Sequence, residues 1–374
     1  MSLKAVSCIV LVNLLLASFT FGDSRHELNF PDILDYKTFK CDFHMHTVFS
    51  DGQVWPTVRV DEAWRGGLDV IAISDHIEYS PHKQEIPINH NRPYEIAASR
   101  AKEKNILLIK GAEITRAIPP GHFNAIFLKD IAPLDTNDFT DNDLKDAAKL
   151  VNAVKSANEQ GGFVFWNHPG GFADWHPVTN GWLDVHTKLY ENKLLHGIEV
   201  ANGDTYYPDA HRWCLEKNLT MMGGSDMHDP FSNSENLNAN HRTITLVFAK
   251  EKSMEAVKEA LREGRTAVWC GTQLIGREKY LDAIFKASIK VAKPHYRQND
   301  QLWCEIRNNS CVDIQMEKTG TDKVEKLILP ANSTTLLKTT AKDDAGQIKL
   351  SYVVKNFLIA PDKGLPVKLT IHLQ

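Results

Sequence analysis

Histidine and carboxylate side chains occur in closely spaced pairs at two places far apart in the chain. His44-Met-His46 and Asp226-Met-His228 each place two such side chains two residues apart. In an extended segment, residues i and i+2 point to the same side, so both members of a pair can reach one ion. Mixed imidazole and carboxylate ligands without thiolate suit zinc, manganese or iron, whereas oxygen ligands alone would suit magnesium or calcium. The pairs therefore predict a divalent metal site.

Further residues of these types follow other apolar, strand-like runs. Because the carboxyl ends of parallel strands share one face of a barrel, we expect such residues to converge there. The candidate ligands are His44, His46, Asp51, His76, Glu113, His122, His168, Asp226 and His228. They are too many for one ion and fit two or three, with Glu113 as the candidate bridging carboxylate. So many buried imidazoles and carboxylates would be costly without cations to pair them.

Several residues near these motifs have plainer alternatives. Asp51 lies in Ser-Asp-Gly and could simply make a turn. Asp75 is expected to be an outer partner of the ligands or a strand cap. His176 could line the pocket, whereas the histidines outside the motifs are expected to be ordinary hydrogen-bonded residues.

Strand-like and helical segments alternate from about Lys37 to Cys270. The strand-like runs include residues 39–43, 68–74, 106–109, 163–166, 197–200, 219–222, 243–248 and 266–269. Helices are expected at 58–65, behind Pro56, at 141–159 and at 254–263. This alternation predicts an α/β fold with a parallel sheet, and seven or eight units favour closure into a barrel. An open doubly wound sheet is the alternative, but no glycine-rich dinucleotide loop follows the first strand.

Beyond about Tyr280 the helical segments stop. Strand-like runs separated by turns rich in Asn, Asp and Gly predict a small all-β domain of the sandwich kind. The expected organisation is therefore a barrel over residues 37–275 and a β domain over 285–374. This second domain could bind carbohydrate, complete the pocket or simply pack on the barrel, and packing is the default expectation.

Residues 1–22 are typical of a signal peptide, with a basic start and an apolar run before small residues. A retained membrane anchor is the alternative, although the run is slightly short and contains Asn13 and Ser18. No later run is long enough to span a bilayer, so we expect an exported bacterial protein, periplasmic or secreted. Cys304 and Cys311 could pair there or stay isolated thiols. A net charge of −4 argues against polymeric nucleic acid as a partner.

The motifs resemble those of the polymerase and histidinol phosphatase (PHP) family of metal-dependent phosphoesterases. Asp42-Phe-His44-Met-His46, with Ser-Asp51-Gly and Ser-Asp-His76, is similar to the opening signature of that family. Glu113, His168 and Asp226-Met-His228 are similar to its later motifs. The resemblance covers about residues 39–270 and implies a distorted (β/α)7 barrel.

The same resemblance implies how the ligands are shared among metal ions. One ion would be held by His44, His46, Glu113 and Asp226. A second would use Glu113, His122 and His168, and a third would use Asp51, His76 and His228. The resemblance implies two or three divalent ions, zinc, manganese or iron, and Asp226, His228 and Glu113 as the catalytic ligands.

The implied reaction is hydrolysis of a small phosphate ester by a hydroxide that bridges two metals. Thr115-Arg116 followed by Pro119-Pro-Gly-His122 is similar to a group of exported bacterial phosphodiesterases, which favours diesters over monoesters. A basic side chain would help to hold phosphate. The candidate substrate-binding residues are Arg116, Arg92, Asn167 and Asn202, although Arg92, in the expected long loop after the second strand, could equally be a solvated surface charge.

Other activities are compatible with such a site. A phosphomonoesterase of the same fold is one alternative. A barrel hydrolase for carbon–nitrogen bonds is another, but it often needs a bridging lysine, and only Lys110 lies at a strand end. A non-catalytic, metal-stabilised binding module is the third.

Overall fold

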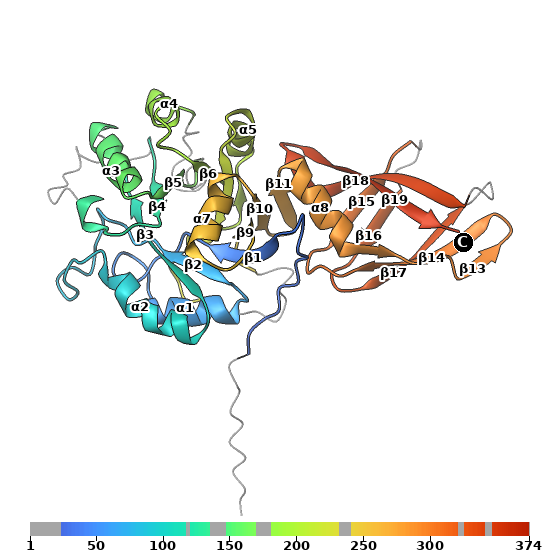
Figure 1. Ribbon diagram of the computed structural model, residues 1–374, viewed down its shortest axis with the longest axis horizontal. Helices are drawn as coiled ribbons and strands as arrows, with labels where there is room; N and C mark the ends of the chain where they lie inside the picture. Colours follow the sequence, from blue (N-terminus) through green and yellow to red (C-terminus); the bar gives the residue numbers. More distant parts are fainter. Residues whose placement is uncertain are drawn as a thin grey trace, which may run out of the picture.

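Two domains lie side by side along the longest axis of the molecule (Figure 1). The computed structural model describes residues 24–116, 120–134, 147–169, 181–231, 241–320, 325–340 and 346–373. The first domain is α/β, and the second is all-β. The expected signal peptide, His176 and the start of the expected helix 141–159 lie outside the described residues.

The α/β domain is built on a parallel-rich sheet. Its strands are β1 (Lys37–Asp42), β2 (Val70–Ile73), β3 (Leu107–Ile114), β4 (Phe123–Ile126), β5 (Phe163–Trp166), β6 (Gly197–Asn202), β8 (Thr220–Gly224), β9 (Ile244–Ala249) and β10 (Thr266–Cys270). They pair in the order β10-β9-β1-β2-β3-β4-β5-β6-β8, and a two-residue strand β7 (Thr205–Tyr206) flanks β6. As expected for strands buried on both faces, β2 and β5 are continuous apolar runs, and β9 is apolar except for Thr245.

Two strands of this sheet run against the rest. β4 is antiparallel to both β3 and β5, and β9 is antiparallel to β1. The connection between β3 and β4, residues 115–122, is too short for a crossover helix, which needs about a dozen residues. A purely parallel sheet, as the alternation suggested, is therefore not formed at β4.

Threonine hydroxyls join the two ends of the sheet into a barrel. Thr245 Oγ1 in β9 donates to Gly223 O in β8 (2.8 Å) and accepts from Gly223 N (2.9 Å). Thr266 Oγ1 in β10 donates to Met221 O in β8 (2.7 Å). These side-chain hydrogen bonds thus satisfy backbone groups of Met221 and Gly223, although β8 forms no backbone ladder with β9 or β10.

Helices surround the barrel. They are α1 (Pro56–Arg65), α2 (Arg92–Glu103), α3 (Ala147–Glu159), α4 (Asp184–Glu191), α5 (Pro208–Glu216), α7 (Met254–Arg262) and α8 (Glu278–Ser288). Pro56 begins α1, as predicted from its fixed φ and missing N–H. Ser253 caps α7 by accepting from Ala256 N (3.2 Å). No helix among the described residues is both long and apolar enough to cross a bilayer, and export stays a prediction.

The second domain is formed by two sheets. One contains β12 (Ile289–Val291), β13 (Tyr296–Gln298), β14 (Gln301–Asn308) and β17 (Thr334–Thr340). The other contains β15 (Ile314–Lys318), β16 (Lys326–Leu329), β18 (Gln347–Ala360) and β19 (Lys363–His372). Along β14, buried Leu302, Cys304 and Ile306 alternate with more exposed residues, the pattern of a sheet with one covered face.

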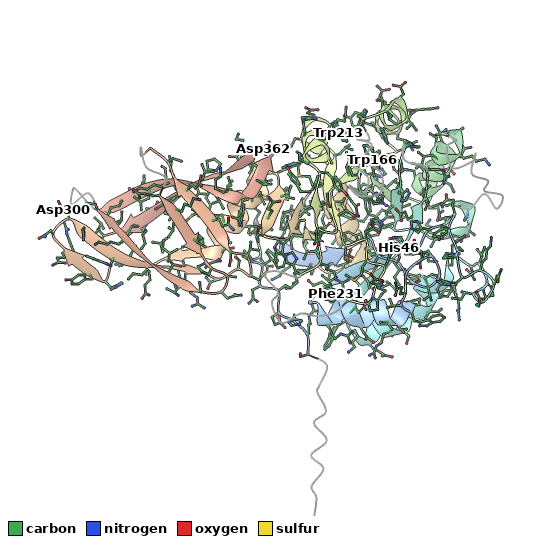
Figure 2. The ribbon with its side chains drawn as sticks, turned by 180° about the vertical axis from the view of Figure 1, so that it is seen from behind. His46, Trp166, Trp213, Phe231, Asp300 and Asp362 are labelled. Carbon is green, nitrogen blue, oxygen red and sulfur yellow. The ribbon has the colours of Figure 1, made fainter. Side chains whose placement is uncertain are left out.

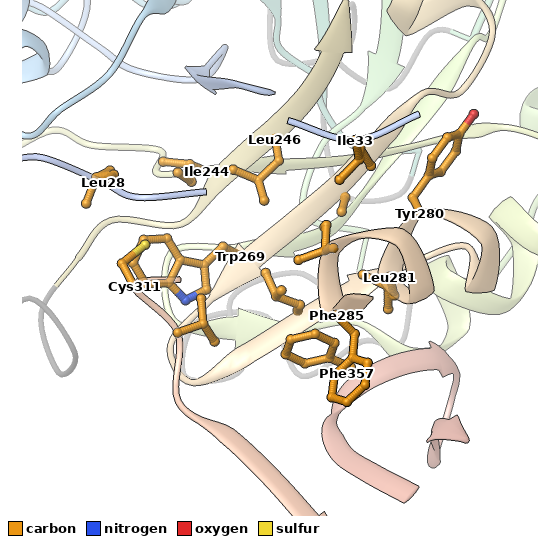
Figure 3. Close-up of a cluster of buried hydrophobic side chains, with 14 of the residues drawn as sticks. Leu28, Ile33, Ile244, Leu246, Trp269, Tyr280, Leu281, Phe285, Cys311 and Phe357 are labelled. Atoms are coloured by element: carbon orange, nitrogen blue, oxygen red, sulfur yellow. The ribbon is translucent and has the colours of Figure 1, made fainter. Parts of the chain in front are cut away.

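The β domain packs on the barrel, as expected. β11 (Gln273–Gly276) pairs in parallel with β18 and so continues the barrel sheet into the second domain. A single apolar cluster joins Trp269 and Leu281 to Phe357 and Cys311 across the junction (Figure 3). The far tip of the β domain, at Asp300, lies at the opposite end of the molecule from His46 (Figure 2).

The cysteines of the described residues are buried free thiols. Cys304 and Cys311 are among them, so they form no disulfide with each other. Burial raises the pKa of Cys311 to about 12, which keeps its thiol protonated and inert.

Candidate metal centre

The barrel strands deliver the predicted ligands to one face. His44 and His46 follow β1, while Asp226 and His228 follow β8, and the two segments are bonded to each other. Asp226 N donates to His44 O (2.9 Å), and His46 N donates to Met227 O (3.0 Å). Metal-compatible groups of three or four side chains together include all nine candidate ligands. The structure therefore brings residues from six segments of the chain into one cluster.

Four donor atoms meet at the most buried point of this cluster. His44 Nε2 lies 3.4 Å from Glu113 Oε2 and 3.2 Å from Asp226 Oδ1. His46 Nε2 lies 3.3 Å and 3.1 Å from the same two oxygens. Ligands at about 2.0–2.1 Å from a tetrahedral ion are separated by roughly 3.3 Å, so these distances are those of a coordination shell.

Three of these four atoms have no hydrogen bond to explain their burial. His44 Nε2, His46 Nε2 and Glu113 Oε2 are buried without a hydrogen-bond partner. Buried polar atoms without a partner are rare and costly, because each has lost its hydration. A divalent cation would satisfy all of them together, so the residues present fit a metal.

Glu113 connects this point to a second one. Its other oxygen, Oε1, lies 3.0 Å from His122 Nδ1 and 3.5 Å from His168 Nε2. Asn167 Nδ2 donates to the same Oε1 (2.8 Å). The two oxygens of one carboxylate thus face two different ligand groups, the arrangement that a bridging carboxylate needs.

A third group lies at the open side of the cluster. Asp51 Oδ1 is 3.1 Å from His228 Nε2 and 3.5 Å from His76 Nε2. The side chains of Asp51 and His228 are 29% and 33% exposed, whereas those of His44 and Glu113 are 0% and 1% exposed. A ligand from solvent would therefore reach the third group first.

Two of the candidate ligands have a positive backbone φ, which residues other than glycine seldom adopt. His168 has φ of 27°, and Asp226 has φ of 51°. Left-handed conformations at such residues cost free energy and are concentrated at functional sites. Here they turn both side chains back toward Glu113 immediately after β5 and β8.

A solved bacterial structure matches almost the whole chain. The two-domain protein from Bacteroides vulgatus, described as containing a predicted PHP-like metal-dependent phosphoesterase, is 43% identical. The match covers 93% of this chain and 99% of that one, with a TM-score of 0.84. The chain belongs to the PHP-like family of metal-dependent phosphoesterases. The chain shares with that relative its fold, a barrel followed by an all-β domain.

Other comparisons cover parts of this PHP-like chain. A family model described as an Ig-like domain (DUF5001) matches residues 289–370, within the β domain. An uncharacterized protein of Methanocaldococcus jannaschii, MJ1295, is 40% identical over 83 residues, which are 22% of this chain. The alignment spans 35% of that relative's length.

One carboxylate that was not predicted from the sequence orients the metal-binding residues. Glu199, on β6 and fully buried, has Oε1 2.9 Å from His44 Nδ1. Its Oε2 accepts from His168 N (2.9 Å) and from Asn202 Nδ2 (2.8 Å). A carboxylate on the outer nitrogen of a metal-binding histidine fixes its tautomer and orientation. The available signal was a lone Glu within the apolar run Gly197-Ile-Glu-Val200.

We expect Glu199→Gln to weaken divalent metal binding by about 10- to 100-fold. The substitution keeps the shape of the side chain but removes the charge that orients the ring of His44. Competition with a metal indicator would measure the dissociation constant. Glu305→Gln, at an exposed position of β14, is the matched control and should bind metal like the parent protein. Equal affinities for the two variants would exclude this role of Glu199.

Two further residues hold the loops that carry the ligands. Asp75 Oδ1 accepts from Thr47 N (2.6 Å) and Ser50 Oγ (2.7 Å), so it acts as the outer partner that was expected. Arg59, buried on α1, donates to His46 O (2.7 Å) and to the backbone oxygens of residues 227–229. Arg59 was not predicted, because an arginine on a helix is usually a surface residue.

The two predicted phosphate-binding arginines are placed differently from expectation. Arg116 is buried, and its guanidinium forms an ion pair with the buried carboxylate of Glu78. Arg92 begins α2 instead of lying in a loop, is 54% exposed, and pairs with Glu95 (3.0 Å). Each charge is thus offset by a neighbouring carboxylate. The partner of Arg116 lies 38 positions earlier in the chain, so this pairing cannot be read from the local sequence.

Asn167 and Asn202 lie close to the ligands but are engaged with protein groups. Asn167 donates to Glu113 and to Asn124 Oδ1 (3.0 Å), and Asn202 donates to Glu199. Both side chains are buried. Their contacts orient the two carboxylates, whereas they were predicted to bind substrate.

The carboxylates of the centre are held in their charged form. Burial alone would raise the pKa of Glu113, but His76 and His44 hold that pKa well below its usual value. Burial would also raise the pKa of Asp226, and His44 and His46 hold it well below its usual value. The centre therefore offers negative charge to a cation near neutral pH.

The same charges raise the pKa of some ligand histidines, whereas burial and neighbouring histidines lower the pKa of His46 and His122. Burial would lower the pKa of His44, but Asp226 and Glu199 raise it well above its usual value. Burial would likewise lower the pKa of His76, and Glu113 raises it well above its usual value. In metal-depleted protein these imidazoles keep their protons near neutral pH. A metal ligand must be deprotonated, so metal and protons compete.

Metal uptake by chelator-treated protein should therefore release protons and weaken as the pH falls. We expect the affinity for Zn²⁺ to drop about tenfold per pH unit for each proton displaced, between about pH 8 and pH 6. Calorimetric titration in two buffers of different ionisation enthalpy counts the protons. An affinity that stays constant over this range, with equal heats in both buffers, would contradict the raised pKa values.

Proposed function

We propose that this protein hydrolyses small phosphodiesters with two or three divalent ions, zinc, manganese or iron, held by the nine clustered ligands. One observation carries the proposal. The Nε2 atoms of His44 and His46 each lie 3.1–3.4 Å from a carboxylate oxygen of Glu113 and from one of Asp226. These four atoms are the ligand atoms of the most buried group. Beside them, Glu113 presents its second oxygen to another pair of histidines.

The protein residues provide a rigid, charged frame for the reaction. Divalent ions bound here would acidify a water molecule and neutralise the oxygens of a phosphate. Glu199 accepts from His44, which leaves the other ring nitrogen free to act as a ligand. The more exposed group of Asp51, His76 and His228 faces the side from which a substrate can enter.

The preference for diesters rests on charge as well as on the sequence resemblance. Near neutral pH a phosphomonoester carries nearly two negative charges, since its second pKa is about 6, whereas a diester carries one. Arg116 is paired with Glu78, and Arg92 is paired with Glu95. Neither predicted arginine therefore offers an uncompensated charge for a dianion, which favours the monoanionic substrate.

Hydrolysis of bis(p-nitrophenyl) phosphate and p-nitrophenyl phosphate, measured side by side, tests the proposal. We expect kcat/KM to be at least about tenfold higher for the diester and to vanish on chelation. Equal turnover of the two esters would remove the diester preference. Hydrolysis of p-nitroacetanilide without either ester would instead support the carbon–nitrogen alternative.

A further inference from the structure

A basic groove is lined by residues of α2, β3 and α7. It consists of two hollows, of about 400 Å³ and about 320 Å³, that share Tyr94 as a lining residue. Each hollow has the size of a small-molecule pocket. Five lysines line them, namely Lys110, Lys129 and Lys258 in the first and Lys102 and Lys252 in the second. We call the two hollows together the lysine groove.

The lysine groove is separate from the metal centre. Lys110 and Glu113 lie three residues apart on β3, so their side chains point to opposite faces of the strand. At about 3.3 Å per residue, their backbones are about 10 Å apart along it. Glu113 faces the ligand cluster, and Lys110 therefore faces away from it.

The lysines of the groove outnumber the carboxylates that act on them, which are Asp130 beside Lys110, Asp69 beside Lys252 and Glu255 beside Lys258. Among the described residues, no carboxylate forms an ion pair with any of its five lysines. Lys110 Nζ donates to the neutral oxygens Asn91 Oδ1 (3.1 Å) and Lys129 O (3.0 Å). One acidic residue, Glu255, lines the first hollow. Burial, together with Arg262 and Lys129, lowers the pKa of Lys258, as expected where positive charges crowd together. An anion would relieve this repulsion.

Aromatic rings supply an apolar part to the same groove. Lys258 Nζ lies 5.6 Å from the ring centroid of Phe127, and Lys110 Nζ lies 5.0 Å from that of Tyr94. Phe127 has φ of 63°, a left-handed conformation that a bulky residue rarely adopts. Backbone strain of this kind is concentrated at ligand clamps and functional loops. The ring of Phe127 is thus held beside the lysines at a conformational cost.

We propose that the lysine groove binds a small organic molecule with a planar apolar body and two anionic groups. The rings of Tyr94 and Phe127 would contact the body, and the lysines of the two hollows would contact the anionic ends. Lysine ammonium groups are suited to phosphate, sulfonate or carboxylate as point charges. This site goes beyond the proposed hydrolysis and does not rest on it.

Fluorescence titration with naphthalene-1,5-disulfonate tests the inference on the intact protein. This probe has the planar body and two permanent charges, and it has no phosphoester to hydrolyse. We expect saturable binding, weakened about five- to tenfold by Lys129→Gln with Lys258→Gln. The matched control, Lys363→Gln with Lys368→Gln on β19, removes the same charge from the other domain and should bind like the parent protein.

Three results would overturn the inference. One is a lack of saturable binding below about 1 mM probe. Another is equal weakening by both double variants, which would show a general charge effect. The third is displacement by sulfate at the concentration at which the probe itself binds, which would show that the aromatic body contributes nothing.

Discussion

Asp226→Asn is expected to lower kcat/KM for a phosphodiester by about three orders of magnitude. Asp226 Oδ1 is one of the four buried donor atoms and lies within 3.2 Å of both His44 Nε2 and His46 Nε2. The amide keeps the shape of the side chain but loses the charge. Asparagine also tolerates a left-handed backbone, so the φ of 51° is not disturbed.

A second carboxylate in the same loop controls for this substitution. Asp229 is exposed, and Gln53 Nε2 donates to it (2.5 Å). Asp229→Asn should keep kcat/KM within about twofold of the parent protein. Comparable losses in the two variants, or full activity in Asp226→Asn, would remove Asp226 from the catalytic centre. Circular dichroism of both proteins shows whether folding is retained.

Gly224→Ala is expected to disable the centre although glycine contributes no ligand. A methyl group at this position would lie 2.4 Å from Glu199 Oε1 and 2.6 Å from His44 Cβ. Both contacts are too short, so Glu199 and His44 must shift and the hydrogen bond between them would be disturbed. We expect about a hundredfold loss of kcat/KM and a free energy of unfolding lower by about 1–3 kcal/mol.

Gly181→Ala is the matched control, because a methyl group there meets no atom of the described residues within 4 Å. It should leave activity unchanged and the melting temperature within about 2 °C. If Gly224→Ala retained full activity and metal content, then the close approach of β8 to His44 and Glu199 would not be required. The pair of variants thus separates the packing of this centre from general effects of adding a methyl group.

The metal ligands were predictable because their signals are local. His44-Met-His46 and Asp226-Met-His228 combine a ligand type with a position just beyond an apolar strand. Strand ends of a barrel share one face, so residue type and position together were enough to predict convergence. The structure brings all nine candidates together in overlapping groups.

The residues that orient the ligands were harder to predict because their roles depend on distant partners. Arg59 binds backbone oxygens of residues 227–229, and Glu199 binds His44, which lies 155 positions earlier in the chain. Arg116 looked available for phosphate, yet the buried Glu78, 38 positions earlier, neutralises it. Apart from the position of Glu199 within an apolar run, nothing near these residues in the sequence indicates such contacts.

Parts of the fold were missed for a related reason. β4 has four residues and begins only nine positions after β3 ends, too short a signal to separate from a loop. α2 follows the polar stretch after His76, and Arg92 at its start was therefore placed in a loop. The antiparallel direction of β4 follows only from its pairing with β3 and β5.

Anomalous X-ray diffraction at the zinc, manganese and iron absorption edges tests the central claim most directly, because it locates and identifies bound ions in crystals. A peak is predicted about 2.0–2.3 Å from His44 Nε2, His46 Nε2, Glu113 Oε2 and Asp226 Oδ1, with at least one more on the far side of Glu113. Crystals of folded, divalent-metal-supplemented protein without any anomalous peak among these side chains would contradict the account.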